Sequence, residues 1–384
     1  MIKALTTVQS VSRRAGGMYD GVRRLCQELS ELDVESQLFS LCDDHTAEDI
    51  IRWGEIRPTV LPVAGKYGYS PKLMKAVLSC DADIAHGHGL WNYTGMAVKR
   101  WAARNDKPYI VSVHGMLHKR ALECSRVKKL LAGMVFEKGY LSGAACLRAV
   151  TEAEVSMIRD YGLRNPVCVV PNAVDVLETR DRKPEARDQK GERVLLYLGR
   201  LHRGKNLENL IKAWSLLLKD DSTAHWILVI AGWGEDGYAD SLKKLADRLG
   251  SGDGISFRGE VRAEEKTALY ESADAFVLPS LFEGQPLSVM EAWAHGLPAV
   301  MTEACNLEGG FEEGAAVKTG PTKDELAKAI GKIINMSDEE RESMGNKGRD
   351  YVAREMTWKN SAHKMMLVYK WVLGQEDKPE FVDL

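Results

Sequence analysis

The amino-acid sequence predicts an α/β fold of two Rossmann-like domains, each built around a parallel sheet. Short apolar runs alternate with longer amphipathic stretches in both halves of the chain, which is the β/α/β pattern of a parallel sheet covered on both faces. A chain of 384 residues is longer than one ordinary core needs. Residues 175–193 are charged, include Pro184 and lack apolar periodicity, so we interpret them as a linker. The predicted domains are residues 1–178 and 179–357.

The apolar runs are short enough that we predict a strand at each of them. In the first domain the predicted strands are residues 2–8, 34–41, 59–63, 82–86, 109–113, 146–150 and 167–170. In the second domain they are residues 194–198, 226–231, 255–257, 275–278, 299–302 and 315–317. Thr151 and Glu154 have the spacing of a capping box for the helix that follows them. A last helix, from Trp358 to about Leu373, has an apolar face that needs a partner.

Composition and charge are those of a soluble globular protein. Hydrophobic residues make up 45% and charged residues 28% of the chain, and no apolar run approaches the roughly 20 residues that span a bilayer. A net charge of −3 without basic repeats disfavours a nucleic-acid partner. The start of the chain does not have the pattern of a signal peptide, so we expect a cytoplasmic protein. The scattered cysteines form no C-x-x-C pair, which disfavours a disulfide framework or a zinc site.

Positive charge gathers in residues 118–138, where basic side chains surround an apolar stripe. The basic residues are Lys119, Arg120, Arg126, Lys128, Lys129 and Lys138, and the stripe is Leu130, Leu131, Val135 and Phe136. A helix of this kind can rest on an anionic surface, so peripheral contact with the inner face of a membrane is one interpretation. The alternative is an ordinary helix packed on the sheet with its basic face in water.

The run from residue 279 to 300 places two carboxylates near one predicted helix. Glu283 lies in a polar turn, Pro286 has the φ suited to a first helical position, and Glu291 follows about two turns along the axis. A helix start has unpaired N–H groups and a partial positive charge that can hold a phosphate. Carboxylates are good acceptors for sugar hydroxyls, so the spacing fits a nucleotide's diphosphate and ribose. The alternative is a pair of solvated surface glutamates.

Two cations are predicted to lie at the carboxyl edge of the second sheet. Arg200 and Lys205 occupy the turn between the strand at residues 194–198 and a helix that starts near Leu207. Ligands of open α/β folds bind at this edge, and a guanidinium fork with a lysine point charge suits a diphosphate. A pair of exposed surface cations is the alternative.

Glycines and histidines mark the corresponding edge of the first sheet. Gly16 and Gly17 follow the first strand, where a glycine pair permits positive φ and close approach of a ligand; a plain turn is the alternative. His114 follows the strand at residues 109–113, and His86 and His88 end the preceding strand. Three histidines could suggest a metal site, but no carboxylate pattern accompanies them, so we predict no metal ligands.

Together these motifs resemble one known family. GRLHRGKN (199–206), EGQPLSVMEAWAHG (283–296, with the spacing E-x7-E), VVPNAVD (169–175) and SVHGML (112–117) resemble motifs of the family 4 retaining nucleotide-sugar glycosyltransferases, which have the GT-B architecture. Three further motifs are similar to motifs of bacterial enzymes that build surface polysaccharides: HGHGLWN (86–92), VTEAE (150–154) and TEACNLEG (302–309). The resemblance covers nearly the whole chain. It implies two Rossmann-like domains facing a cleft, the first for the acceptor and the second for the donor, and a terminal helix (358–384) that crosses back to the first domain.

The resemblance also implies roles for single residues. Glu283 would hold the donor sugar, Glu291 the ribose and His114 the transferred sugar, while the base would lie near the backbone of Arg258 and Val261. Trp91 and Asn92 are candidates for the acceptor side, with core packing of Trp91 as the alternative. The predicted catalytic residues are His114, Arg200, Lys205 and Glu283, and the other predicted substrate-binding residues are Gly16, Gly17, Trp91, Asn92, Arg258, Val261, Gly284, Leu287, Ser288 and Glu291.

The expected mechanism follows from the charge that must be stabilised. Bond breaking leaves negative charge on the diphosphate, and Arg200, Lys205 and the helix start would receive it in place of a divalent ion, so we expect no metal and no cofactor. We find no convincing nucleophile, so we expect front-face attack in which the departing phosphate takes the acceptor's proton. Gln285 and Pro286 depart from the residues that most often follow E-G in this family, which leaves the donor sugar open because this turn would touch it. Pro286 also removes one N–H, so the N–H groups from Leu287 onward would bind the phosphate.

The expected activity is transfer of a hexose from a UDP-sugar, less often a GDP-sugar, to a glycan or lipid-linked glycan in surface polysaccharide biosynthesis. A sugar phosphorylase or a nucleotide-sugar epimerase on the same fold is an alternative, since fold does not determine function. A non-catalytic nucleotide-sugar-binding partner is a second alternative. The pairing of two cations with the E-x7-E motif favours transfer over epimerisation.

Overall fold

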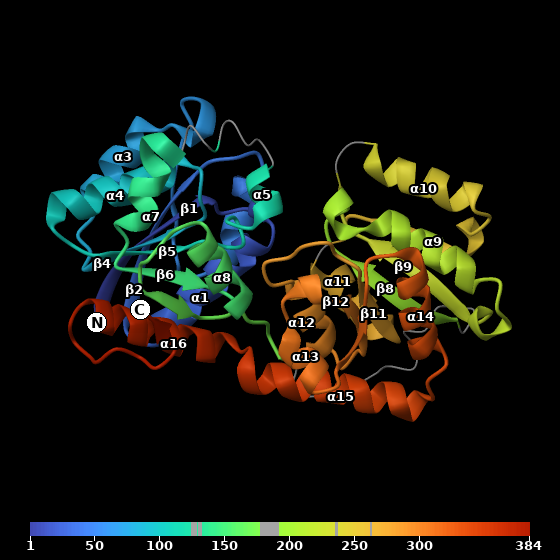
Figure 1. Ribbon diagram of the computed structural model, residues 1–384. Helices are drawn as coiled ribbons and strands as arrows, with labels where there is room; N and C mark the ends of the chain where they lie inside the picture. Colours follow the sequence, from blue (N-terminus) through green and yellow to red (C-terminus); the bar gives the residue numbers. More distant parts are fainter. Residues whose placement is uncertain (124–128, 130–132, 177–191, 235–236, 262) are drawn as a thin grey trace. The chain divides into compact units, whose positions relative to one another are not determined.

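The computed structural model describes residues 1–123, 129, 133–176, 192–234, 237–261 and 263–384 (Figure 1). These residues form two compact units. The first comprises Met1–Asn172 together with Trp358–Leu384, and the second comprises Ala173–Thr357. The terminal helix therefore belongs to the first unit. Most of the predicted linker, residues 177–191, lies outside the described residues.

The first unit contains a sheet whose strand order is β14-β7-β6-β5-β4-β1-β2-β3. The strands are β1 Ile2–Ser10, β2 Val34–Leu41, β3 Thr59–Leu61, β4 Ile84–His88, β5 Tyr109–Ser112, β6 Cys146–Ala149, β7 Val167–Val169 and β14 Val382–Asp383. All neighbours pair in parallel except β14, which runs antiparallel to β7. The predicted strands of this domain are confirmed. The sequence analysis missed β14, because two residues are too few to show a periodicity.

Helices cover the two faces of this sheet. They are α1 Gly17–Ser30, α2 Thr46–Asp49, α3 Pro71–Leu78, α4 Tyr93–Asn105, α5 Lys119–Glu123, α7 Lys138–Ser142, α8 Glu152–Asp160 and α16 Trp358–Val372. Leu5 and neighbouring strand residues pack with α3 and α4, whereas Val8 and Leu38 pack with α1. Helix α16 lies beside α1 (Figure 1) and buries the apolar face that the sequence had left without a partner.

The second unit contains a parallel sheet of strand order β10-β9-β8-β11-β12-β13. The strands are β8 Arg193–Leu198, β9 Trp226–Ala231, β10 Ile255–Gly259, β11 Ala275–Leu278, β12 Ala299–Thr302 and β13 Ala316–Thr319. The helices are α9 Leu207–Leu217, α10 Tyr238–Arg248, α11 Ala263–Ser272, α12 Leu287–Ala294, α13 Glu308–Glu312, α14 Lys323–Ile334 and α15 Asp338–Glu355. Helix α9 packs against α10 and α14, and α12 packs against α15 (Figure 1).

Each sheet has a point at which the chain reverses its direction of travel across the strands. In the second unit β8 leads outward to β9 and β10, and the chain then returns to place β11 on the other side of β8. In the first unit the same reversal occurs between β1 and β4. Ligands of open α/β sheets bind outside the carboxyl ends of the strands at such a point. The topology therefore directs attention to the loops after β8 and β11, and to those after β1 and β4.

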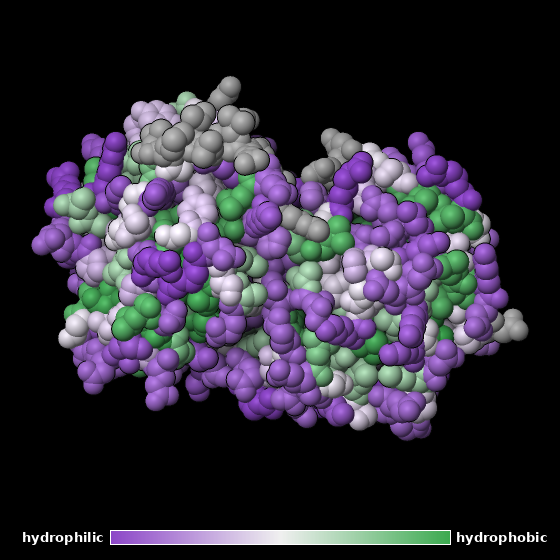
Figure 2. Space-filling model, viewed as in Figure 1, coloured by the Kyte–Doolittle hydropathy of each residue, from purple (hydrophilic) through white to green (hydrophobic). Residues whose placement is uncertain are grey.

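Apolar residues appear in scattered groups among hydrophilic ones on the face in view (Figure 2), and no described helix is both long and apolar enough to cross a membrane. Within the predicted basic helix, α5, a π-helical turn at Gly133–Glu137 and α7 are described. The basic residues Arg126 and Lys128 and the apolar Leu130 and Leu131 lie outside the described residues.

Candidate active site

The loops after β8 and β11 bring Lys205 and Glu283 together. The Lys205 ammonium donates to Glu283 Oε1, and the Ser280 hydroxyl donates to the same oxygen at 2.5 Å. The side chains of Lys205 and Glu283 are 22% and 12% exposed, so water still reaches the pair. A backbone hydrogen bond of 2.8 Å from Leu281 N–H to the Gly204 carbonyl joins the two loops directly. A cation and a carboxylate thus lie side by side at the reversal point of the sheet.

The turn that carries Glu283 is held by residues from the end of β12. The Asn306 side-chain amide donates to the carbonyl oxygens of Glu283 at 2.8 Å and Gly284 at 3.2 Å. The Thr302 hydroxyl donates to the Ser280 carbonyl at 2.6 Å. Asn306 has a φ of 53°, a left-handed conformation that asparagine tolerates better than most residues. The sequence analysis missed Ser280 and Asn306, although the latter lies within the TEACNLEG motif.

Helix α12 begins one residue later than predicted. Pro286 has φ −78° and ψ 105°, so it is the extended N-cap residue and Leu287 is the first helical residue. The prediction of Pro286 as the first helical residue was wrong, because ψ at this position is extended although φ suits a helix. Counted from Leu287, Glu291 lies four residues, or about one turn, along the helix, and it lies eight residues after Glu283. No side chain among the described residues caps the helix, which leaves its first N–H groups, from Leu287 and Ser288, directed at the turn.

Glu291 has partners that the sequence analysis did not find. Lys266 Nζ lies 2.5 Å from its Oε1, and the Tyr270 hydroxyl donates to its Oε2 at 2.9 Å. Burial, together with the neighbouring carboxylate, raises the pKa of Tyr270 well above its ordinary value, so its hydroxyl keeps its proton and remains a donor. Lys266 and Tyr270 lie on one face of α11, four positions apart, which was the available sequence signal.

Arg200, Arg258 and Val261 lie at the carboxyl ends of two strands of the second sheet, β8 and β10. The Arg200 guanidinium lies over the Trp233 ring at 5.0 Å from its centroid, and the Tyr197 hydroxyl donates to the Arg200 carbonyl at 2.9 Å. Arg258 and Val261 lie at the carboxyl end of β10, which is separated from β8 by β9. The structure thus groups Lys205 with Glu283, and places Arg200 beside Trp233.

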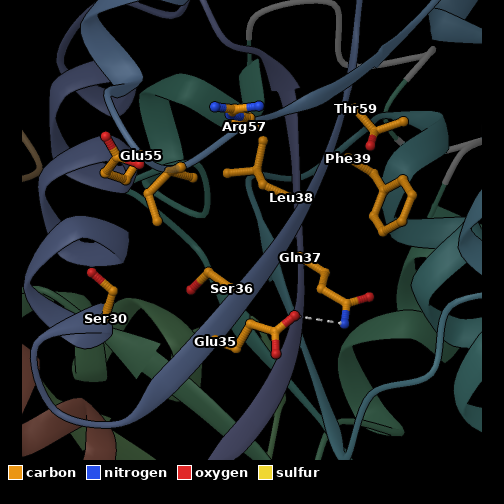
Figure 3. Close-up of a pocket in the computed structure, with 10 residues that line it drawn as sticks. Ser30, Glu35, Ser36, Gln37, Leu38, Phe39, Glu55, Arg57 and Thr59 are labelled. Atoms are coloured by element: carbon orange, nitrogen blue, oxygen red, sulfur yellow. Dashed lines mark hydrogen bonds between the residues drawn. The ribbon is translucent and has the colours of Figure 1, made fainter.

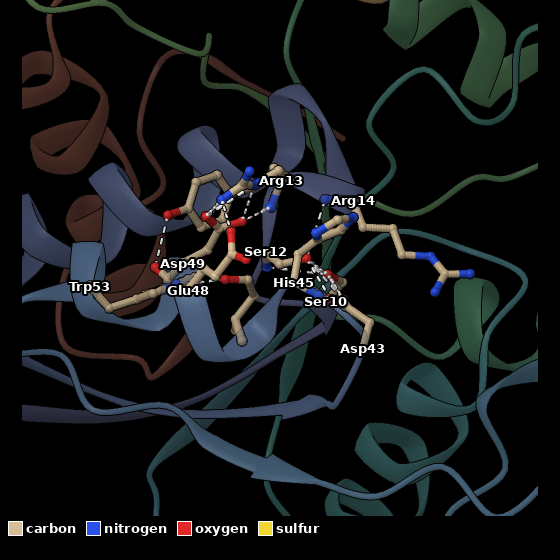
Figure 4. Close-up of polar contacts among 11 residues, drawn as sticks. Ser10, Ser12, Arg13, Arg14, Asp43, His45, Glu48, Asp49 and Trp53 are labelled. Carbon is tan, nitrogen blue, oxygen red and sulfur yellow. Dashed lines mark hydrogen bonds and ion pairs between the residues drawn. The ribbon is translucent and has the colours of Figure 1, made fainter. Parts of the chain in front are cut away.

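In the first unit two carboxylates hold the loop between β1 and α1 (Figure 4). Asp43 accepts from Ser10 at 2.5 Å and from Ser12 at 2.8 Å, and these bonds, against the effect of burial, lower its pKa. Asp49 accepts from the Arg13 guanidinium and its backbone N–H, which lowers the pKa of Asp49.

This loop ends at the glycine pair. Gly16 has a φ of 59°, and a Cβ added there would meet open space, while Gly17 is the first residue of α1. The left-handed conformation, rather than crowding, is therefore the reason for glycine at position 16.

His114 lies beyond the end of β5 in a left-handed conformation with a φ of 50°. Its Nε2 lies 3.0 Å from His88 Nδ1. Both nitrogens of His86 are also occupied, Nε2 by the Ser112 hydroxyl at 2.8 Å and Nδ1 by the Tyr369 hydroxyl at 2.7 Å. Burial, reinforced by Arg148, lowers the pKa of His114 to about 3, so the ring is neutral near pH 7. His88 and His114 are thus hydrogen-bonded to each other, whereas His86 contacts His88 only through their rings, 4.1 Å apart between centroids. The described part of the chain contains no group of His, Cys, Asp and Glu placed to hold a metal.

Trp91 and Asn92 follow β4, and their side chains differ in burial and in contacts. Asn92 is 4% exposed and is the N-cap of α4: its oxygen accepts from Gly95 N–H and the Thr94 hydroxyl, and its amide donates to the Leu90 carbonyl. Its side chain therefore caps α4 within the fold, and its contact with an acceptor stays a prediction. Trp91 is half-buried with a φ of 63°, and Lys129 lies 5.8 Å from its ring centroid.

A hollow of about 440 Å³ lies elsewhere in the first unit (Figure 3). Residues of β2 and of the segment before β3 line it, among them Glu35, Gln37, Phe39, Glu55 and Arg57. No predicted site residue borders it. Its lining comes from the body of β2 and not from the carboxyl edge of the sheet.

Solved structures of similar fold cover nearly the whole chain. A sucrose-phosphate synthase from Thermosynechococcus elongatus aligns with a TM-score of 0.78 at 19% identity, over 98% of this chain and 100% of that one. Anabaena Alr3699/HepE, in complex with UDP and glucose, aligns with a TM-score of 0.78 at 18% identity, over 96% and 100%. At these identities the likeness shows the fold alone, and that fold is GT-B.

Sequence comparisons identify the family. Residues 16–173 match the model of the glycosyl transferase 4-like domain, and residues 178–351 match that of glycosyl transferases group 1. A D-inositol 3-phosphate glycosyltransferase from Corynebacterium aurimucosum is 26% identical, over 94% of this chain and 92% of its own. An alpha-monoglucosyldiacylglycerol synthase from Streptococcus pneumoniae is 26% identical, over 75% and 68%. Taken with the fold, these matches show that the chain belongs to the family 4 glycosyltransferases of GT-B architecture.

Proposed function

We propose that this glycosyltransferase transfers a hexose from a UDP-sugar to a glycan or lipid-linked glycan with retention of configuration and without a metal ion. The observation that carries the proposal is the Lys205–Glu283 pair at the reversal point of the second sheet, next to the uncapped start of α12. A cation, free N–H groups and a carboxylate in one place can bind a diphosphate and an attached sugar.

In the proposed mechanism, positively charged and N–H groups of the second unit stabilise the negative charge of the leaving diphosphate. As the bond to the anomeric carbon breaks, Lys205, Arg200 and the N–H groups of Leu287 and Ser288 stabilise the departing diphosphate. These groups occupy the place of a divalent ion. Glu283 accepts from hydroxyls of the donor sugar. The acceptor hydroxyl attacks from the face that the diphosphate leaves, and its proton passes to the departing phosphate oxygen.

The nucleotide and the transferred sugar have further contacts in this proposal. Glu291 accepts from the ribose hydroxyls, since each of its oxygens has spare lone pairs after binding Lys266 and Tyr270. The backbone near Arg258 and Val261 holds the base. His114 contacts the transferred sugar.

The donor and the acceptor are proposed from two kinds of support. HepE was solved with UDP-glucose, which favours a UDP-sugar. Relatives are named for inositol phosphate and diacylglycerol acceptors, so acceptors vary within the family. The HGHGLWN and VTEAE motifs favour surface polysaccharide biosynthesis.

We also propose a cytoplasmic protein that contacts the inner face of a membrane through residues 118–138, in which Lys119 and Lys138 are exposed. Co-sedimentation with phosphatidylglycerol vesicles, and none with phosphatidylcholine vesicles, is the expected result.

The test combines binding and turnover. UDP should raise the melting temperature, because a ligand stabilises the state that it binds. With a lipid-linked glycan acceptor, UDP release should require the acceptor, continue in EDTA and yield a product with the donor's anomeric configuration by NMR. Glu283→Ala should abolish transfer, whereas Glu271→Ala, at an exposed position on α11, should not. UDP release without an acceptor, or turnover by Glu283→Ala, would contradict the proposal.

A further inference from the structure

We infer that Glu154 and His88 are positioning residues for His114: Glu154 holds its backbone and His88 holds its ring so that Nδ1 is the nitrogen offered to the ligand. The inference rests on the proposed function, in which His114 contacts the transferred sugar. Neither residue was predicted to take part in the reaction from the sequence.

The backbone at His114 needs external support. His114 and Gly115 have φ values of 50° and 72°, so two successive residues are left-handed. This conformation costs a non-glycine residue about 1 kcal/mol or more and persists only where surrounding contacts hold it. A histidine in this state, at a strand end beside the predicted ligand, is therefore a strained residue that the fold maintains.

Glu154 supplies the support. Its side chain is 1% exposed, and one oxygen accepts the Gly115 N–H while the other accepts the Val150 N–H at 2.6 Å. The carboxylate thus ties the turn after β5 to the end of β6. The predicted capping box is only half formed for this reason: Thr151 accepts from Glu154 N–H, but the carboxylate of Glu154 is used at Gly115 and Val150.

His88 holds the ring of His114. His114 Nε2 lies 3.0 Å from Nδ1 of His88, whose side chain is 1% exposed. The ring of His88 lies against that of His86, with centroids 4.1 Å apart, and His86 is itself fixed by Ser112 and by Tyr369 of α16. Because Nε2 is occupied, Nδ1 is the ring nitrogen of His114 without a partner among the described residues. A ligand atom that bonds this ring must therefore meet Nδ1.

Matched variants separate positioning from folding. Glu154→Gln keeps the shape but can satisfy only one of the two N–H groups, and Glu152→Gln makes the same change at an exposed position on α8. His88→Leu removes the nitrogen that holds His114, whereas His88→Asn places an amide group near the position of Nδ1. We expect kcat to fall about ten- to a hundredfold in Glu154→Gln and His88→Leu, with partial rescue in His88→Asn. The affinity for UDP alone, which lacks the sugar, should stay within about twofold.

A spectroscopic measurement keeps the inference testable if a variant fails to fold. In wild-type protein with ¹⁵N-labelled histidine, addition of UDP-glucose should shift the His114 Nδ1 resonance, and UDP alone should not. A shift confined to Nε2 would overturn the inference. So would full kcat in Glu154→Gln and His88→Leu while His114→Ala is inactive. Full turnover in His114→Ala would instead refute the role of His114 in the proposed function.

Discussion

Replacing Lys205 by Met removes the ammonium group that contacts Glu283 and leaves an uncharged thioether chain of similar length. The variant has two separable consequences, because Lys205 both pairs with a poorly exposed carboxylate and is proposed to hold the departing diphosphate. After the substitution Glu283 retains the Ser280 hydroxyl as a donor but has lost its counter-ion. The structure therefore predicts losses in both stability and turnover.

The size of each loss follows from exposure and from charge. Breaking a fully buried ion pair costs about 3–5 kcal/mol, but the Lys205 and Glu283 side chains are 22% and 12% exposed, so we expect about 1–2 kcal/mol. For a unit of this size that corresponds to a fall in Tm of about 2–8 °C. Removing one fixed charge from a transition-state site costs about 3–4 kcal/mol, or about 10²- to 10³-fold in kcat.

The double variant Lys205→Met/Glu283→Gln distinguishes the two effects. It removes the unpaired carboxylate, so the free energy of unfolding should return towards wild type, while transfer from UDP-glucose should stay as low as in the single variant. Urea unfolding and initial rates measure the two quantities, and Lys219→Met, at an exposed position beyond the end of α9, is the control. Recovery of activity together with stability, or normal kcat in Lys205→Met, would refute the reasoning.

Three further results are expected. Burial raises the pKa of Glu137 from 4.5 to about 7, so the folded state loses about 3–4 kcal/mol of stability, at about 1.4 kcal/mol per pH unit, as pH rises from about 4.5 to 7. Glu137→Gln should therefore stabilise the protein to urea at pH 8 but not at pH 4; equal effects at both would contradict this. Gly345→Ala should destabilise the protein by about 2–3 kcal/mol, because an added Cβ would lie 1.9 Å from the Gly296 carbonyl oxygen. Gly331→Ala in α14 should stabilise it by about 0.5–1 kcal/mol, because the nearest atom to an added Cβ there is 3.6 Å away. A higher melting temperature for Gly345→Ala than for Gly331→Ala would be inconsistent with this packing. Glu291→Gln should weaken the binding of UDP about tenfold and leave the binding of pyrophosphate unchanged, as measured by calorimetry. Equal losses of affinity for both ligands would contradict the proposed contact of Glu291 with the ribose.

The sequence predicted the strands and the general place of the site because both depend on local signals. Apolar runs mark buried strands wherever they occur, and in a parallel sheet the residues after each strand lie at one edge. Arg200 and Lys205 were predicted in this way, and Glu283 was predicted from its place just before a helix. The start of α12 was displaced by one residue because φ of Pro286 suits both an extended and a helical residue, and only ψ distinguishes them.

The pairings within the site were decided by the tertiary structure. Lys205 and Glu283 are 78 positions apart, and they meet because β11 returns to lie beside β8. The same holds for Glu154, whose carboxylate reaches Gly115 only because β6 lies next to β5. The amino-acid sequence by itself determined the two sheets, their carboxyl edges and the residue types present there. Which carboxylate meets which donor was decided by strand order, since periodicity carries no information on the order in which strands pair.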